Sequence, residues 1–156
     1  MKYIIEDLNK MEDFAAKLAK SLKSGDVISL IGDLGAGKTT LTQYVLKHLG
    51  VEENVTSPTF ALVNIYRAPG DGLNIYHLDM YRIEDPEEIE QIDFESYFYP
   101  EGISFIEWAE KVEGYLPDDM IEIRIDYEDK GRSIVIEENT GRAKEIIEDI
   151  DENTRS

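Results

Sequence analysis

The chain has 156 residues, of which 42% are hydrophobic and 10% aromatic, and it carries a formal net charge of −18 at neutral pH. No apolar run approaches the roughly 20 residues of a membrane-spanning helix, and residues 1–14 carry acids where a signal peptide needs an apolar segment, so we expect one globular, cytoplasmic domain. The lack of cysteine excludes disulfides, thiolate catalysis and cysteine-based zinc sites. The high negative charge argues against unaided nucleic-acid binding. It is expected either to keep the protein soluble or to favour a partner with a basic face.

The first third of the chain predicts a helix, a strand, a glycine-rich loop and a second helix, in that order. Asn9 is a candidate cap for a helix that runs to about Lys23. Residues 26–31 (DVISLI) are mostly apolar and β-branched, which is typical of a buried parallel strand. Residues 39–50 predict a helix that is closed by Gly50. A strand before the loop and a helix after it are the context that a phosphate-binding loop requires.

Strand patterns dominate the middle of the chain. Residues 60–66 and 73–79 flank a turn at residues 68–72, and they predict a β-hairpin. The run Asp85-Pro86-Glu87-Glu88 predicts a helix start, with a cap, a proline at the first position and acids in the first turn. Residues 103–108 (ISFIEW) predict another buried strand.

A second hairpin and a C-terminal tail follow. Residues 120–128 and 132–138 alternate around Asp129-Lys130-Gly131, which predicts the hairpin. Residues 139–156 predict a short amphipathic helix that then frays, so the boundaries of the single domain are expected at residues 1–138. Together the elements predict a three-layer α/β sandwich whose sheet mixes parallel and antiparallel strands.

The glycine-rich loop carries a phosphate-binding pattern. Its residues 32–39 (GDLGAGKT) match G-x-x-x-x-G-K-[ST]. The glycines let backbone N–H groups turn inward to form an anion nest, and the helix that follows adds the positive end of its dipole. We expect Lys38 to reach the outer phosphates and the Thr39 hydroxyl to ligate Mg²⁺. A chance match is disfavoured, because the expected strand precedes the loop and the expected helix follows it.

A loop of this kind needs an acid elsewhere to hold the metal's water shell and to orient the attacking nucleophile. Glu107 follows the apolar run at residues 103–106, as expected of a Walker B strand, and Asp79 ends the run at residues 75–78. The alternative for each acid is an ordinary strand-end carboxylate that caps the next turn. That alternative carries weight in a chain with 34 acidic residues.

Residues 56–60 (TSPTF) follow the second helix, where many P-loop proteins place a segment that senses the γ-phosphate. Thr56, Ser57 and Thr59 offer hydroxyls, and Pro58 stiffens the backbone. Taken alone, this stretch would more simply be a plain turn before a strand.

Several short motifs together resemble the TsaE family, the small ATPases of bacterial tRNA threonylcarbamoyladenosine modification. The motifs are GDLGAGKTT (32–40), SPTF (57–60), HLDMYR (77–82), IEW (106–108) and GR (131–132). The resemblance runs from about Leu8 to Glu138, and Met80 stands where the family pattern has leucine. Many families share the phosphate-binding loop, but the other motifs in this order and spacing are specific.

The resemblance implies a P-loop NTPase variant that hydrolyses ATP within a complex with the proteins TsaB and TsaD, and that is a weak ATPase alone. TsaD transfers threonylcarbamoyl to adenosine 37 of tRNA, so this chain would meet tRNA only through the complex. By matching position, Thr39 and Glu107 would hold Mg²⁺, and Asp79, Glu107 and Lys38 would be catalytic. The residues expected at the nucleotide are Asn9, Asp33, Leu34, Gly35, Ala36, Gly37, Lys38, Thr39, Thr40, Thr59, Trp108 and Arg132. For Arg132, a hairpin arginine paired with a surface acid is the competing interpretation.

Two other functions fit the same loop. A kinase for a small molecule or a protein would need an acceptor pocket and usually a lid with arginines that clamp the transferred phosphate. The six arginines of the chain do not cluster in such an insertion, which favours hydrolysis. A nucleotide-gated binding module, in which hydrolysis is incidental, also stays open.

Overall fold

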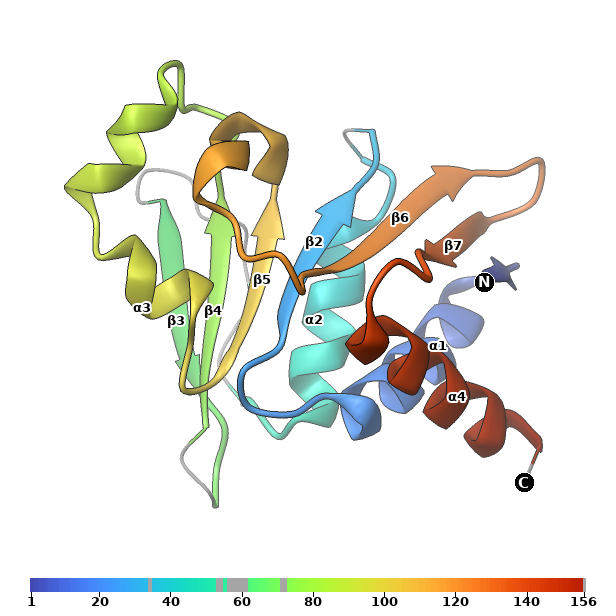
Figure 1. The fold of residues 1–156 in the computed structure, drawn as a ribbon. Coiled ribbons are helices and arrows are strands. Elements are labelled where there is room, and N and C mark those ends of the chain that lie inside the picture. The colour runs from blue at the N-terminus through green and yellow to red at the C-terminus, as the bar shows by residue number, and fades with distance from the viewer. Residues whose placement is uncertain (34, 53–54, 56–61, 71–72, 156) are drawn as a thin grey trace.

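The computed structural model describes residues 1–33, 35–52, 55, 62–70 and 73–155, and one mixed β-sheet runs through them (Figure 1). Seven strands in these described residues lie in the order β1-β7-β6-β2-β5-β4-β3. The pairs β1-β7, β6-β2 and β2-β5 join strands that are not consecutive in the chain, so distant parts of the sequence meet in the sheet.

Parallel strands form the centre of the sheet. β2 (Val27–Ile31) lies between β5 (Ile103–Glu107) and β6 (Ile121–Tyr127), and β4 (Asn74–Asp79) lies beyond β5. All residues of β5 are buried, as expected of a parallel strand that is covered on both faces. Because the carboxyl ends of parallel strands meet at one edge, the residues that end β4 and β5 lie beside the loop that follows β2.

Antiparallel strands complete the sheet on both sides. β3 (Val63–Arg67) pairs with β4, β7 (Arg132–Ile136) pairs with β6, and β1 (Lys2–Ile5) pairs with β7 at the edge. Both predicted hairpins are therefore confirmed, and β1 is a strand that the sequence patterns did not predict. Residues 60–61 of the first hairpin and 71–72 of its turn lie outside the described residues.

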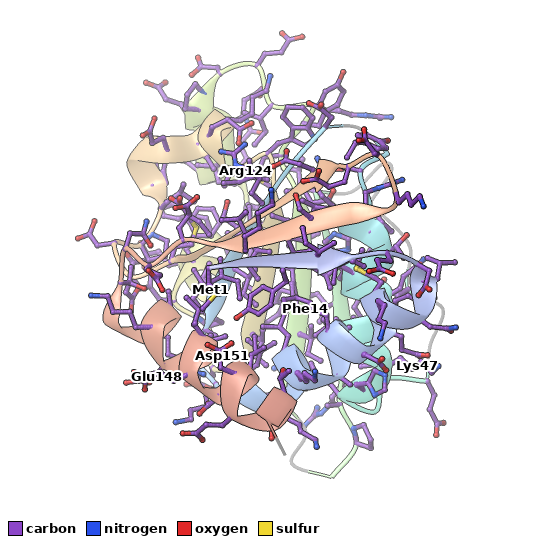
Figure 2. All side chains as sticks on the ribbon, turned by 90° about the vertical axis from the view of Figure 1, so that its right-hand side faces the viewer. Met1, Phe14, Lys47, Arg124, Glu148 and Asp151 are labelled. Atoms are coloured by element: carbon purple, nitrogen blue, oxygen red, sulfur yellow. The ribbon has the colours of Figure 1, made fainter. Side chains whose placement is uncertain are left out.

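Helices cover both faces of the sheet, so the predicted three-layer α/β architecture is confirmed (Figure 1). The larger apolar cluster lies beneath α1 (Leu8–Ser21), α2 (Lys38–His48) and α4 (Gly141–Arg155). Phe14 of α1, labelled in Figure 2, is one of its buried side chains. Within the part of the chain that the structure describes, no helix is both long enough and apolar enough to cross a membrane.

The opposite face carries shorter helices over a smaller apolar cluster. They are the 3₁₀ helices η1 (Pro86–Gln91) and η2 (Ala109–Tyr115) and the short α3 (Phe94–Phe98). The predicted start at Asp85 is confirmed, because Asp85 and Glu88 form a capping box there. The helix that follows is 3₁₀ rather than α.

The first helix differs from its prediction at both ends. Asp7, and not Asn9, is the N-cap, because the Asp7 carboxylate accepts the backbone N–H of Lys10 at 2.9 Å. Asn9 consequently lies inside the first turn. The helix ends at Ser21, short of the predicted Lys23, because the next residue is already extended.

The C-terminal segment also differs from its prediction. The sequence predicts a short helix that frays within residues 139–156, whereas α4 continues to Arg155. An apolar stripe holds it against the larger cluster through Ala143, Ile146, Ile147 and Ile150. α4 therefore shares the core of the domain predicted at residues 1–138.

Candidate functional site

The loop between β2 and α2 presents a helix N-terminus to the carboxyl edge of the sheet. Gly37 is the N-cap of α2, with φ at 117°, a conformation that favours glycine. It makes no side-chain cap bond, and the N-terminus of a helix is an electrostatically favourable place for an anion. On the other side of the loop, a Cβ on Gly32 would overlap the carbonyl oxygen of Ile125 in β6. Glycine is therefore required there by close packing.

Lys38 is the first residue of α2, and its side chain turns back over the loop. It is buried, and its Nζ donates a hydrogen bond to the carbonyl oxygen of Gly32 at 2.8 Å. The same Nζ lies 4.5 Å from the centre of the Trp108 ring, within the range of a cation–π contact. The ammonium is thus held at the loop by a carbonyl and an aromatic face.

Trp108 follows β5 directly and has an unusual backbone conformation. Its φ of 58° and ψ of 40° are left-handed, and no other non-glycine residue in the described ranges has a positive φ. Its ring also contacts that of Tyr81, with 5.1 Å between the ring centres. Such conformations cluster at functional sites, where the surrounding packing enforces them.

The two predicted acids lie side by side. Asp79 and Glu107 face each other in the register of the parallel strands β4 and β5. Glu107 is buried, and its Oε2 lies 2.6 Å from Nε2 of His77. Asp79 accepts the backbone N–H of Tyr81 at 3.0 Å.

Burial raises the pKa of Asp79 above its ordinary value, and the charge of Glu107 adds to this increase. The Tyr81 N–H, His77 and Lys38 act in the opposite direction. Lys38 is therefore close enough to act on Asp79 electrostatically.

The oxygen donors at this edge fit Mg²⁺. This ion is commonly held by one or two carboxylates together with substrate phosphates and water. Asp79 and Glu107 supply carboxylates, and Thr39 lies in the first turn of α2. The described residues contain no group of three or more His, Asp or Glu side chains that would hold a metal by themselves. A metal here would therefore depend on bound phosphate for the rest of its ligands.

A cavity of about 250 Å³ opens on one side of the loop. Arg132 borders it: its Nε donates to the carbonyl oxygen of Ala36 at 2.9 Å, and its guanidinium lies 4.2 Å from the centre of the Tyr127 ring. Arg132 thus does not simply pair with a surface acid. The lining comes from β1 and α1, from the loop and from the β6–β7 turn, and includes Asp7, Leu8, Met11, Gly35, Ala36, Gly37, Thr40 and Arg132.

A smaller cavity of about 190 Å³ lies on the other side of the loop. The side chains around it come from the loop, η2 and β6, and they include Asp33, Lys38, Trp108, Glu110 and Arg124. Lys38 therefore borders the smaller cavity, while Gly37, the residue before it, borders the larger one.

Most of the predicted site residues within the described ranges converge on this edge. Lys38, Asp79, Glu107 and Trp108 lie at this edge, and the predicted loop residues that line the two cavities are Asp33, Gly35, Ala36, Gly37, Lys38 and Thr40. Asn9 is exposed in α1 and lines neither cavity. Leu34 and the segment 56–60, which contains Thr59, lie outside the described residues.

Sequence reasoning missed several neighbours of the site. His77 belongs to the HLDMYR motif, so the motif offered a signal for the histidine as well as for Asp79. Asp7, Leu8 and Met11 line the larger cavity from the start of α1. No local pattern indicates their role, because only the tertiary fold brings α1 to the loop.

Comparisons with known proteins agree with this geometry. Residues 5–134 match the family model described as threonylcarbamoyl adenosine biosynthesis protein TsaE. A tRNA threonylcarbamoyladenosine biosynthesis protein TsaE from Haemophilus influenzae is 41% identical over 151 residues, which cover 94% of each chain. The protein of the same name from Bacillus subtilis is 44% identical over 112 residues, or 70% of this chain and 68% of the relative. The crystal structure of YdiB from Bacillus subtilis superposes with a TM-score of 0.79 at 29% identity, covering 99% of this chain and 94% of YdiB.

Proposed function

The chain belongs to the TsaE family of tRNA threonylcarbamoyladenosine biosynthesis proteins, and from this membership we propose that it is the ATPase of a complex with TsaB and TsaD. In this proposal, ATP binding and hydrolysis drive the assembly or the reset of the complex. Threonylcarbamoyl transfer to adenosine 37 of tRNA takes place on TsaD, in the cytoplasm. The chain then meets tRNA only through its partners.

The observation that supports ATP binding is the convergence of a glycine-rich helix N-terminus, a lysine and two carboxylates at one sheet edge. The backbone N–H groups at the start of α2 receive the phosphates, and Lys38 exchanges its Gly32 carbonyl for a phosphate oxygen. The larger cavity beside the loop accepts the nucleoside, with Arg132 at its border. In this proposal, each part of ATP meets a separate group of residues.

The reacting end of ATP lies, in this proposal, toward the acids. Mg²⁺ would neutralise charge on the phosphate oxygens and orient them. Thr39 and Glu107 are the residues of this chain proposed to hold it. Asp79, whose pKa is raised by burial and by Glu107, lies next to Glu107 and accepts a hydrogen bond from the water that attacks the γ-phosphate.

The proposal predicts a specific dependence of turnover on Lys38. Purified chain mixed with TsaB and TsaD should release phosphate from ATP faster than the chain alone. Lys38→Ala should lower nucleotide affinity or turnover at least about tenfold, since a charge-assisted hydrogen bond is worth about 1.5–3 kcal/mol. The measurements are steady-state phosphate release and calorimetric nucleotide binding.

Lys47→Ala is the matched control for this experiment. Lys47 is an exposed lysine on the same helix, where it pairs with Glu12 at the surface at 2.9 Å. Its replacement should leave binding and turnover unchanged. Wild-type binding and hydrolysis by the Lys38→Ala protein would remove the loop from the mechanism.

Two alternatives have distinct signatures in the same assay. A kinase would consume ATP in proportion to a phosphorylated product instead of free phosphate. A nucleotide-gated module would support full multiple-turnover tRNA modification even when Glu107→Gln abolishes hydrolysis. Phosphate release that matches ATP consumption, together with loss of multiple turnover in Glu107→Gln, would argue against both.

A further inference from the structure

His77 is a buried side chain to which the mechanism above gives no role. It lies on β4 two residues before Asp79, and it is 0% exposed. Its Nε2 lies 2.6 Å from Oε2 of Glu107, which is 5% exposed at the carboxyl end of β5. The other ring nitrogen, Nδ1, has no hydrogen-bond partner among the described residues.

The absence of a partner for Nδ1 among the described residues argues against a purely structural role for the ring. A buried polar atom that makes no hydrogen bond destabilises the folded state. An aliphatic side chain would fill the same space in β4 without this cost, as Ile75 does two residues earlier on the same face. What the histidine adds to the fold is therefore its contact with Glu107.

The direction of this hydrogen bond follows from the chemistry of the partners. An ionised carboxylate only accepts hydrogen bonds, so Nε2 of His77 carries the hydrogen and donates it to Oε2 of Glu107. The bond engages one carboxylate oxygen, restricts the rotation of the group and leaves the other oxygen uncommitted by His77. Carboxylates that ligate metals are typically oriented by such outer hydrogen bonds.

We propose that His77 is a positioning residue that fixes the Glu107 carboxylate for Mg²⁺ at the phosphate-binding loop. This inference rests on the proposed role of Glu107 toward Mg²⁺. The geometry supports it: the histidine, the glutamate and Asp79 lie on adjacent parallel strands in fixed register, and the ring lies within hydrogen-bond distance of the Glu107 carboxylate. His77 itself need not touch the nucleotide or the metal.

Removing the donor should weaken the metal site selectively. His77→Leu keeps a side chain of similar size but cannot donate a hydrogen bond. Its affinity for Mg²⁺, measured by calorimetry with saturating ADP, should fall about 10–100-fold, the usual effect of losing an outer hydrogen bond. Its affinity for ADP in the absence of Mg²⁺ should stay at the wild-type level, because the loop and Lys38 are unchanged.

Two further variants separate positioning from packing. His77→Gln carries an amide N–H close to the position of Nε2 and should recover most of the Mg²⁺ affinity. Ile75→Val changes a fully buried neighbour on the same strand and face, and should leave Mg²⁺ affinity unchanged despite any loss of stability. If His77→Leu does not fold, His77→Asn takes its place, because its amide ends short of Nε2, and the comparison with His77→Gln then decides.

The possible results distinguish this inference from the function on which it rests. Wild-type protein that binds ADP equally well with and without Mg²⁺ would remove the proposed function, and the inference with it. Mg²⁺-dependent binding that His77→Leu leaves intact would overturn the inference alone. Equal losses in His77→Leu and His77→Gln would also overturn it, because they would assign the histidine to packing.

Discussion

Lys38 has two partners within the described part of the chain. Its ammonium is buried, bonded to the Gly32 carbonyl at 2.8 Å and placed 4.5 Å from the centre of the Trp108 ring. A buried charge without partners would be strongly destabilising, so these two contacts offset part of the cost of burying the Lys38 ammonium. In the proposed function, a phosphate oxygen of ATP replaces the Gly32 carbonyl as the partner of Lys38. The lysine is then already at the loop and does not have to move in from solvent.

Trp108 is predicted to store backbone strain at the site. A left-handed residue with a Cβ costs about 1–2 kcal/mol, and glycine avoids this cost. Trp108→Gly should therefore be more stable than Trp108→Ala by about 1 kcal/mol. Urea unfolding of the two variants measures the difference in their free energies of unfolding, provided that the two variants have the same m value.

Gly114 provides the matched control, because it lies in the same helix η2 and its φ is not in the left-handed region. Nothing lies within 4 Å of a Cβ built there, so Gly114→Ala should not destabilise the protein. If Trp108→Ala proves as stable as Trp108→Gly, the backbone at residue 108 is not strained.

At the scale of elements, α4 is attached to the rest of the domain through a partly buried ion pair as well as through its apolar stripe. Arg142 donates to both carboxylate oxygens of Asp26, at 2.8 and 3.0 Å, and also to the carbonyl oxygen of Ser21. Asp26 is buried just before β2. One arginine thus joins the start of α4, the end of α1 and the entrance to the strand that leads to the phosphate-binding loop.

Breaking this ion pair should destabilise the whole domain. Arg142→Met leaves the Asp26 carboxylate buried without its cation, and loss of one partner of such a pair costs about 3–5 kcal/mol. We expect no more than the lower end of that range, because Arg142 is partly exposed and Asp26 also accepts the backbone N–H of Lys23 at 2.7 Å. Chemical denaturation measures the loss in the free energy of unfolding.

Lys144→Met, an exposed position on the same helix, should change stability by no more than about 0.5 kcal/mol. The double variant Asp26→Asn with Arg142→Met should be less destabilised than the sum of its parts, because the stranded charge is gone. Additive losses would show that the two side chains do not interact energetically.

Elements with a strong local signal could be predicted from the sequence, and those that depend on distant pairing could not. The buried run of β5, the alternation of β6 and β7 and the capping box at Asp85 are local, and each prediction is confirmed. β1 contributes only four residues, with one of them buried, and is a strand because β7 lies beside it.

The residues of the candidate site also fall into those that the sequence could predict and those that it could not. Lys38, Asp79, Glu107 and Trp108 belong to motifs or end apolar strands, so sequence alone could select them. The contact of Arg132 with the Ala36 carbonyl joins residues 96 positions apart, and no local pattern encodes it. The apolar stripe of α4 was visible in the sequence, but its partner surface on α1 and the sheet was not.

At the scale of the whole molecule, the net charge of −18 dominates the long-range field. Figure 2 shows Glu148 and Asp151 on α4, and Glu148 is exposed. In the proposed function this field acts on the approach of the TsaB–TsaD pair. We predict that the association rate constant falls as ionic strength rises, whereas the dissociation rate changes less, because salt screens steering more than close contacts.

Rapid-mixing experiments over a range of salt concentrations measure both rate constants. A neutral osmolyte that raises viscosity to the same extent without adding ions is the control for slower diffusion. An association rate that does not respond to salt would show that the acidity of this chain serves solubility and not partner encounter.

The place of Trp108 beside Lys38 has a practical consequence for work on this protein. Trp108 is the single tryptophan of the chain, so its emission arises from one known position, with the lysine ammonium over its ring. A ligand that draws the ammonium toward itself changes the electrostatic environment of the indole and hence its fluorescence. The unlabelled protein therefore carries its own optical reporter of events at the phosphate-binding loop, suited to stopped-flow recording of each step as it occurs.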